Sequence, residues 1–170
     1  MKQRLVRCLF AIAPLGLAAG GCGQDVTLSS DTGQTLCIRY YAQCVDPIFH
    51  KTLSGGFSCS GQGTGCHATD GVGGKFKLVV SPVTDVDLAK NYQSALGQAD
   101  NGPESKLLLK PLLASGMSHG GPKLFVNIND ADYEVILHWI LSTADTQGDL
   151  DPSKDSGQCN AVFRPAPNTC

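Results

Sequence analysis

The stretch NDADYEVILHWILS, residues 129–142, carries the strongest helix pattern in the chain. Asn129 or Asp130 can cap its first turn, and Asp132 and Glu134 put negative charge where a helix N-terminus favours it. Apolar side chains recur three or four residues apart and form one stripe, made of Tyr133, Ile136, Leu137, Ile140 and Leu141. The stretch therefore predicts an amphipathic helix that packs into a core.

Shorter helices are predicted before it. Apolar residues at helical spacing predict a helix or a pair of helices over 37–53, with Asp46-Pro47 placed to restart or bend it. Ser81-Pro82 is placed to begin a second helix, which runs to residue 96. A short apolar helix over 104–109 is expected to be limited by Pro111.

Loops and polar segments separate these helices. Eight of the 21 residues over 54–74 are glycine, which indicates a loop. No stretch alternates cleanly enough to predict a strand, so we expect an all-α domain with long loops over 37–142. A polar tether over 22–36 precedes this domain, and a polar tail with two cysteines, residues 143–170, follows it.

Composition bounds the class of protein. The chain has 170 residues, 42% hydrophobic and 16% charged, which suits one globular domain with appendages. Residues 1–21 hold three basic residues and no acidic one, so the remaining 149 hold 10 basic and 15 acidic residues, a net charge of −5. This balance disfavours a nucleic-acid partner. Eight cysteines indicate an oxidising compartment or a cofactor held by cysteine.

Residues 1–21 have the pattern of an export signal. A basic start precedes an apolar stretch over 5–19, which is too short for a membrane span and is broken by Pro14 and Gly16. Residues 17–22, LAAGGC, resemble the box of bacterial lipoproteins, whose signal peptidase cuts before a cysteine that is then lipidated. This resemblance predicts a lipid anchor on Cys22 in the bacterial cell envelope, facing the periplasm. The outer membrane is favoured because Gly23 follows the cysteine, at the position where an aspartate often marks retention in the inner membrane. The alternative is ordinary secretion with cleavage within 18–22.

Cys66-His67, at the end of a run of glycines, is the most informative pair for chemistry. A cysteine followed directly by histidine ends the C-x-x-C-H motif of c-type haem attachment, where each cysteine bonds a haem vinyl group and the histidine reaches the iron. The preceding cysteine here is Cys59, so the spacing is C-x6-C-H. The same two cysteines also suit a disulfide, and with His67 and His119 they have the ligand types of a zinc site.

Six segments, in the same order, resemble the small c-type cytochrome domains of planctomycete and proteobacterial periplasmic proteins. They span nearly the whole predicted domain. The six-residue insert between the cysteines and a last helix without the usual small-residue ending depart from the family's pattern. The segments are CVDPIF (44–49), GCH (65–67), GGKFKL (73–78), PESKLLLKP (103–111), HGG (119–121) and DYEVILHWI (132–140).

The resemblance implies a cytochrome c-like domain that binds one covalent haem c and carries single electrons, and not an enzyme. Cys59 and Cys66 are then the thioether residues, and His67 is the proximal ligand. For the distal ligand the family match falls on His119. The alternatives are Met117 in the same loop and an open or solvent-ligated sixth site. An electron carrier also needs a redox partner protein, which the sequence does not identify.

Four cysteines lie outside this motif and are expected to form two disulfides, for which three pairings exist. They are Cys37, Cys44, Cys159 and Cys170. The local choice pairs the first two with each other and the last two with each other. With a third disulfide between Cys59 and Cys66, the alternative function is a haem-free, disulfide-stapled lipoprotein that acts as a binding or scaffold module. His50 and His138 are expected to be ordinary structural residues.

Overall fold

The computed structural model describes residues 35–61, 66–100, 102–114, 116–142, 144, 146–155, 159, 162–163 and 170. Within these ranges the chain forms helices and no strand, so the all-α prediction is confirmed for this part. An isolated parallel β-bridge joins Ala68 to Leu78. The predicted export signal and the lipidation residue Cys22 lie outside the described residues.

The first helical segment is continuous from Ile38 to His50, but its hydrogen-bond pattern changes from α to π and back to α. It consists of α1 (Ile38–Tyr40), a π-helical turn η1 (Tyr41–Val45) and α2 (Asp46–His50). Pro47 has no N–H to donate to the carbonyl four residues before it, and the wide turn lies just before this residue. The predicted restart at Asp46-Pro47 is confirmed.

Helix α3 (Asp85–Leu96) begins later than Ser81-Pro82 predicts. Thr84 Oγ1 accepts a hydrogen bond from the Asp87 N–H at 3.2 Å and caps the first turn. A threonine with extended backbone satisfies an N–H that would otherwise have no partner, so it fixes the start of the helix. The segment over 81–83 therefore stays outside the helix.

Two helical pieces follow where one was predicted, a 3₁₀ turn η2 (Gly102–Glu104) and helix α4 (Lys106–Leu112). The expectation that Pro111 limits the helix is wrong, because Pro111 lies inside its last turn. Ser105 caps the helix through the Leu107 N–H, which moves the start to Lys106. The helix ends at Leu112, one residue after the proline, and its C-cap Leu113 takes the left-handed conformation with φ 54°.

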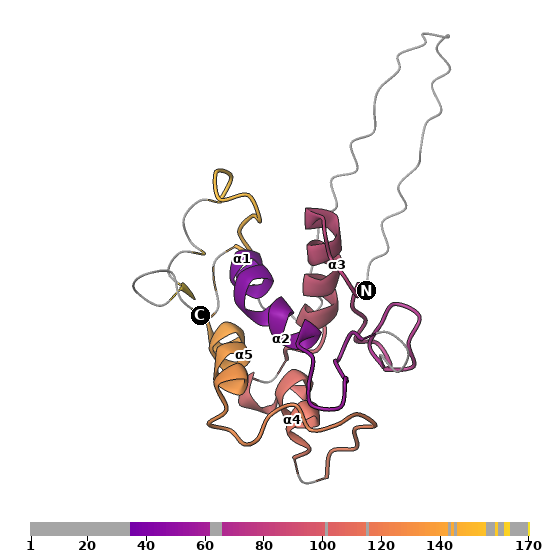
Figure 1. Cartoon of the computed structure of the whole chain (residues 1–170). Helices are drawn as coiled ribbons and strands as arrows, with labels where there is room; N and C mark the ends of the chain where they lie inside the picture. Colours follow the sequence, from indigo (N-terminus) through magenta and orange to yellow (C-terminus); the bar gives the residue numbers. More distant parts are fainter. Residues whose placement is uncertain are drawn as a thin grey trace, which may run out of the picture.

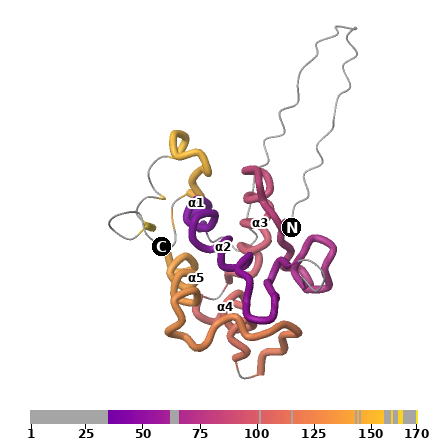
Figure 2. Tube along the Cα trace, in the orientation of Figure 1, coloured from indigo at the N-terminus to yellow at the C-terminus, as the bar shows by residue number. Residues whose placement is uncertain are grey.

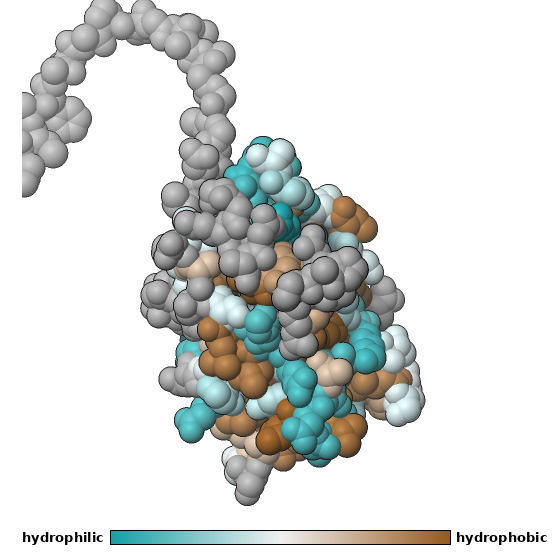
Figure 3. Space-filling view, turned by 90° about the vertical axis from the view of Figure 1, so that its left-hand side faces the viewer, coloured by the Kyte–Doolittle hydropathy of each residue, from teal (hydrophilic) through white to brown (hydrophobic). Residues whose placement is uncertain are grey.

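Helix α5 (Ala131–Leu141) is capped by Asp130, whose carboxylate accepts from the Asp132 N–H at 3.0 Å. Its buried stripe differs from the prediction. Trp139 is fully buried, whereas Leu141 is 57% exposed. Figure 3 shows the face that lies to the left in Figure 1, where apolar and polar side chains are interspersed.

The helices pack around the first helical segment. In Figures 1 and 2, α1 and α2 run between α5 on one side and α3 on the other, and α4 lies below them. Two long connections join these helices. We call residues 51–84, between α2 and α3, the first loop, and residues 113–130, between α4 and α5, the second loop.

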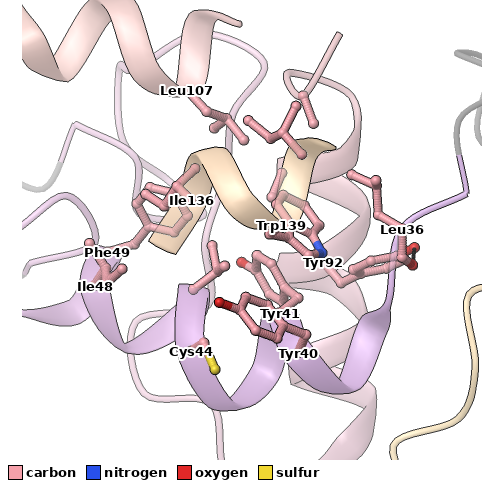
Figure 4. Close-up of a cluster of buried hydrophobic side chains, with 14 of the residues drawn as sticks. Leu36, Tyr40, Tyr41, Cys44, Ile48, Phe49, Tyr92, Leu107, Ile136 and Trp139 are labelled. Carbon is pink, nitrogen blue, oxygen red and sulfur yellow. Dashed lines mark hydrogen bonds between the residues drawn. The ribbon is translucent and has the colours of Figure 1, made fainter. Parts of the chain in front are cut away.

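Aromatic side chains dominate the centre of the core. Tyr41 and Tyr92 pack around Trp139, with ring centroids 5.2 and 6.2 Å from that of the tryptophan (Figure 4). The polar atoms of these rings also find partners: Trp139 Nε1 donates to the Cys37 carbonyl at 3.0 Å, and the Tyr92 hydroxyl donates to the Leu36 carbonyl at 2.6 Å. The core thus extends N-terminally to Leu36.

Two disulfides attach the C-terminal tail to the first helical segment. Cys37 bonds Cys159 and Cys44 bonds Cys170, so the disulfide prediction is confirmed and the local pairing is wrong. The reason is that the tail returns to the domain and contributes to its core: Val162 and Phe163 are buried in the main apolar cluster. Local spacing along the chain does not report this return.

Candidate functional site

The first loop holds His67 through both its backbone and its ring. The His67 N–H donates to the Cys59 carbonyl at 3.1 Å, and the His67 carbonyl accepts from the Leu78 N–H at 2.6 Å. The ring Nδ1 lies 2.9 Å from the Phe76 carbonyl oxygen. Because a carbonyl only accepts, Nδ1 carries the hydrogen of this contact, and Nε2 is the ring nitrogen left to face a metal ion, which is the usual arrangement of a metal-binding histidine.

A glycine permits this close packing of the first loop. The Gly73 N–H donates to the Cys66 carbonyl, and a Cβ atom at this position would lie 2.6 Å from His67 Nδ1. Any side chain at residue 73 would therefore clash with the Cys66 carbonyl group and with the His67 ring. Phe76 packs against the same ring, with centroids 4.9 Å apart. The orientation of His67 is thus fixed by backbone carbonyls, a glycine and an aromatic ring.

His119, in the second loop, faces His67. Their ring centroids are 6.2 Å apart and their planes differ by only 13°. Nδ1 of His119 is buried and has no hydrogen-bond partner among the described residues. Burial lowers the pKa of His119, and His67 and Lys110 lower it further. His119 is therefore a neutral imidazole with an available lone pair.

The spacing of the two rings suits one metal ion between them. C–N bonds of about 1.33 Å put a ring nitrogen about 1.1 Å from the imidazole centroid. Two metal–nitrogen bonds of about 2.0 Å would separate the centroids of two imidazoles whose nitrogens point at the same ion by about 6.2 Å. The centroids of His67 and His119 have this separation. The two predicted histidine ligands come together from the first and the second loop.

Cys59 and Cys66 lie beside this pair, and neither belongs to a disulfide. The pairing between them on which the alternative function depends is therefore not seen. Burial raises the pKa of the Cys59 thiol to about 11, with a further contribution from Cys66 nearby. At neutral pH Cys59 is protonated. Residues 62–65, between these two cysteines, lie outside the described ranges.

Two adjoining cavities share Cys59, His67 and His119 in their walls. The first has a volume of about 80 Å³ and is lined also by Phe49, Phe76, Leu107 and three lysines. The second has about 280 Å³, and its walls include Cys66, Leu53, Phe57, Pro122 and Leu124. We call them the basic cavity and the apolar cavity. Both are partly open to solvent, and together they form one crevice around the histidine pair.

The other residues considered from the sequence are placed differently. Met117, the alternative distal ligand, lines neither cavity. His138 Nε2 lies 2.8 Å from the Val162 carbonyl oxygen, against the C-terminal tail. His50 is held by Ser60 at 2.6 Å and by Asp46 at 3.3 Å. Both histidines are structural, as expected.

The sequence reasoning missed a buried polar network beside the site. Asp46 is 4% exposed and accepts hydrogen bonds from the Tyr41 hydroxyl at 3.1 Å and from Asn91 at 3.0 Å. Burial and this carboxylate raise the pKa of Tyr41 well above its ordinary value. The only sequence signal was the four-residue spacing of Asp46 and His50, which places them on one helix face.

Within the described ranges, no three His, Cys, Asp or Glu side chains gather as a group able to hold a metal ion. The four ligands of a tetrahedral zinc site are therefore not assembled, whereas a haem iron needs only two axial side chains. None of the helices in the described part of the chain has the length and hydropathy needed to cross a membrane.

Comparison with known proteins adds no relative. No family model matches the chain, and no curated protein or solved structure matches it. The residues and their geometry alone carry the functional conclusion.

Proposed function

We propose that this protein is a lipid-anchored, periplasm-facing cytochrome c-like protein that binds one covalent haem and transfers single electrons. One observation carries the proposal. Two imidazole rings, His67 and His119, lie nearly parallel with centroids 6.2 Å apart, in a partly apolar crevice beside two cysteines that are not disulfide-bonded. The C-x6-C-H spacing and the six segments that resemble small c-type cytochrome domains support the same reading.

Each protein group has a distinct task. His67 and His119 would hold the iron, and the Phe76 carbonyl orients His67 through its Nδ1–H. The thiols of Cys59 and Cys66 would hold the porphyrin through thioether bonds to its vinyl groups. Haem iron supplies a reversible one-electron couple when bound.

The apolar walls set the environment of the electron. Phe49, Phe76 and Leu107 on one side and Leu53, Phe57 and Leu124 on the other put apolar surface around the histidine pair. This apolar lining would tune the reduction potential of a bound haem, and the open part of the crevice would give a redox partner access to its edge. The proposed anchor at Cys22 keeps this domain at the membrane through the polar tether.

The test is expression with the chain's own signal in a bacterial host that carries the c-type maturation machinery. We expect a visible spectrum with a low-spin α band on reduction, and a reversible one-electron midpoint in a redox titration. His119→Ala should convert the ferric form to high spin, whereas Met117→Leu should leave the spectrum unchanged. A colourless protein from a host that matures a control cytochrome would favour the haem-free, disulfide-stapled lipoprotein instead.

A further inference from the structure

The two cavities of the crevice differ in charge. The basic cavity is lined by three lysines and by no acidic residue: Lys75, Lys106 and Lys110. The apolar cavity has no charged residue among its described walls. This clustering stands out because the chain after residue 21 has a net charge of −5. Ion pairs in the described part of the chain belong to other basic residues, namely Arg39, His50, Lys51, Lys90 and Lys154.

The three lysines converge from two elements. Lys106 and Lys110 are four residues apart on α4 and therefore share a helix face. Lys75 comes from the first loop, directly before the phenylalanine whose carbonyl orients His67. Lys110 and His119 both line the basic cavity. Three cations without carboxylate partners beside a half-buried crevice repel one another, and an anion between them would relieve this repulsion.

We propose that Lys75, Lys106 and Lys110 bind the two propionate carboxylates of the porphyrin. The inference rests on the proposed haem function and adds the orientation of the macrocycle. An iron protoporphyrin carries both carboxylates on one edge and its vinyl groups away from it. Of the two cysteines, Cys59 lines both cavities and Cys66 lines only the apolar cavity. The vinyl groups therefore lie on the side of the apolar cavity, and the carboxylate edge lies in the basic cavity.

The test compares two porphyrins that differ only at the two propionates, which are charged carboxylates in one and neutral methyl esters in the other. The probes are ferric protoporphyrin IX and its dimethyl ester, titrated by absorbance into the full-length, haem-free chain carrying Cys59→Ser and Cys66→Ser, which cannot form thioethers. In this background one variant adds Lys75→Gln, Lys106→Gln and Lys110→Gln. The matched control adds Lys90→Gln, Lys123→Gln and Lys154→Gln, which removes the same charge from exposed lysines outside both cavities. Near-ultraviolet dichroism checks that each variant is folded.

Two half-exposed carboxylate–ammonium pairs together favour the free acid over the ester by about fivefold to thirtyfold. We expect this ratio in the parent and in the control, and a ratio near one in the variant without Lys75, Lys106 and Lys110. If both porphyrins bind the parent equally, or if only the control loses the preference, the orientation is overturned while the haem function stands. If neither porphyrin binds any chain, the proposed function fails together with the inference.

Discussion

Removing one disulfide at a time tests how the C-terminal tail is attached. Cys37–Cys159 and Cys44–Cys170 span sequence separations of 122 and 126 residues. While one of them is intact, however, the other closes only the short path over 37–44 and 159–170, about 18 residues. Loop entropy gives about 5 kcal/mol for a closed loop of this long span and about 3 kcal/mol for the short one.

The two disulfides should therefore be strongly non-additive. Cys44→Ala with Cys170→Ala should lower the free energy of unfolding by about 3 kcal/mol. Removing Cys37 and Cys159 should cost about the same, plus the packing of two fully buried sulfurs. The chain without either disulfide should lose about 8 kcal/mol, which is more than the two separate losses together.

Urea unfolding of the haem-free chain, followed by the fluorescence of Trp139, measures these free energies. If the wild-type stability is below about 8 kcal/mol, the chain without disulfides unfolds in buffer alone. The local pairing would instead close two short and independent loops, whose losses add to about 5 kcal/mol. Additive losses of that size, or a non-reduced digest in which Cys37 is joined to Cys44, would refute the attachment described here.

Three further predictions concern the site and its surroundings. Gly73→Ala puts a methyl group against His67, so we expect a loss of about 1–3 kcal/mol in unfolding free energy and weaker haem incorporation, measured by urea unfolding and haem content; unchanged incorporation would contradict the close approach. Asp46→Ala strands two buried donors and should cost about 2–4 kcal/mol, and a loss below 1 kcal/mol would contradict the buried network. Burial raises the pKa of Tyr41 and of Tyr92, so folding favours the neutral phenols; stability is then fully present below the unfolded pKa near 10 and falls above it by about 1.4 kcal/mol per pH unit for each tyrosine. Unfolding at pH 9 to 12 measures this slope, which Tyr41→Phe should halve, and a flat profile would contradict it.

Local signals predicted the elements that local chemistry controls. Asp130 caps α5 as its position before an apolar stripe indicates, and Asp46-Pro47 marks the restart of the first helical segment. The errors have equally local causes. Thr84 and Ser105, and not the neighbouring prolines, set the starts of α3 and α4. Which residue caps a helix depends on backbone geometry that the identity of a single residue does not report.

Long-range features needed the structure. The pairing of His67 with His119 followed from motif resemblance, but their separation and parallel planes depend on how the two loops fold. Lys75 and Lys110 come from separate elements and meet only in the folded chain. The negative net charge of the sequence gave no indication of this basic cluster. The disulfide pairing likewise depends on the return of the tail to the core, which spacing along the chain does not encode.

The most direct measurement of the central claim is the pyridine haemochrome spectrum of the denatured chain after acid-acetone extraction. The protein is produced in a host with the c-type maturation machinery, and a chain carrying Cys59→Ser and Cys66→Ser serves as the control. Extraction removes haem that is not covalently bound. The account predicts c-type absorbance that stays with the wild-type chain and is lost from the control. A colourless wild-type chain from a host that matures another cytochrome would contradict it.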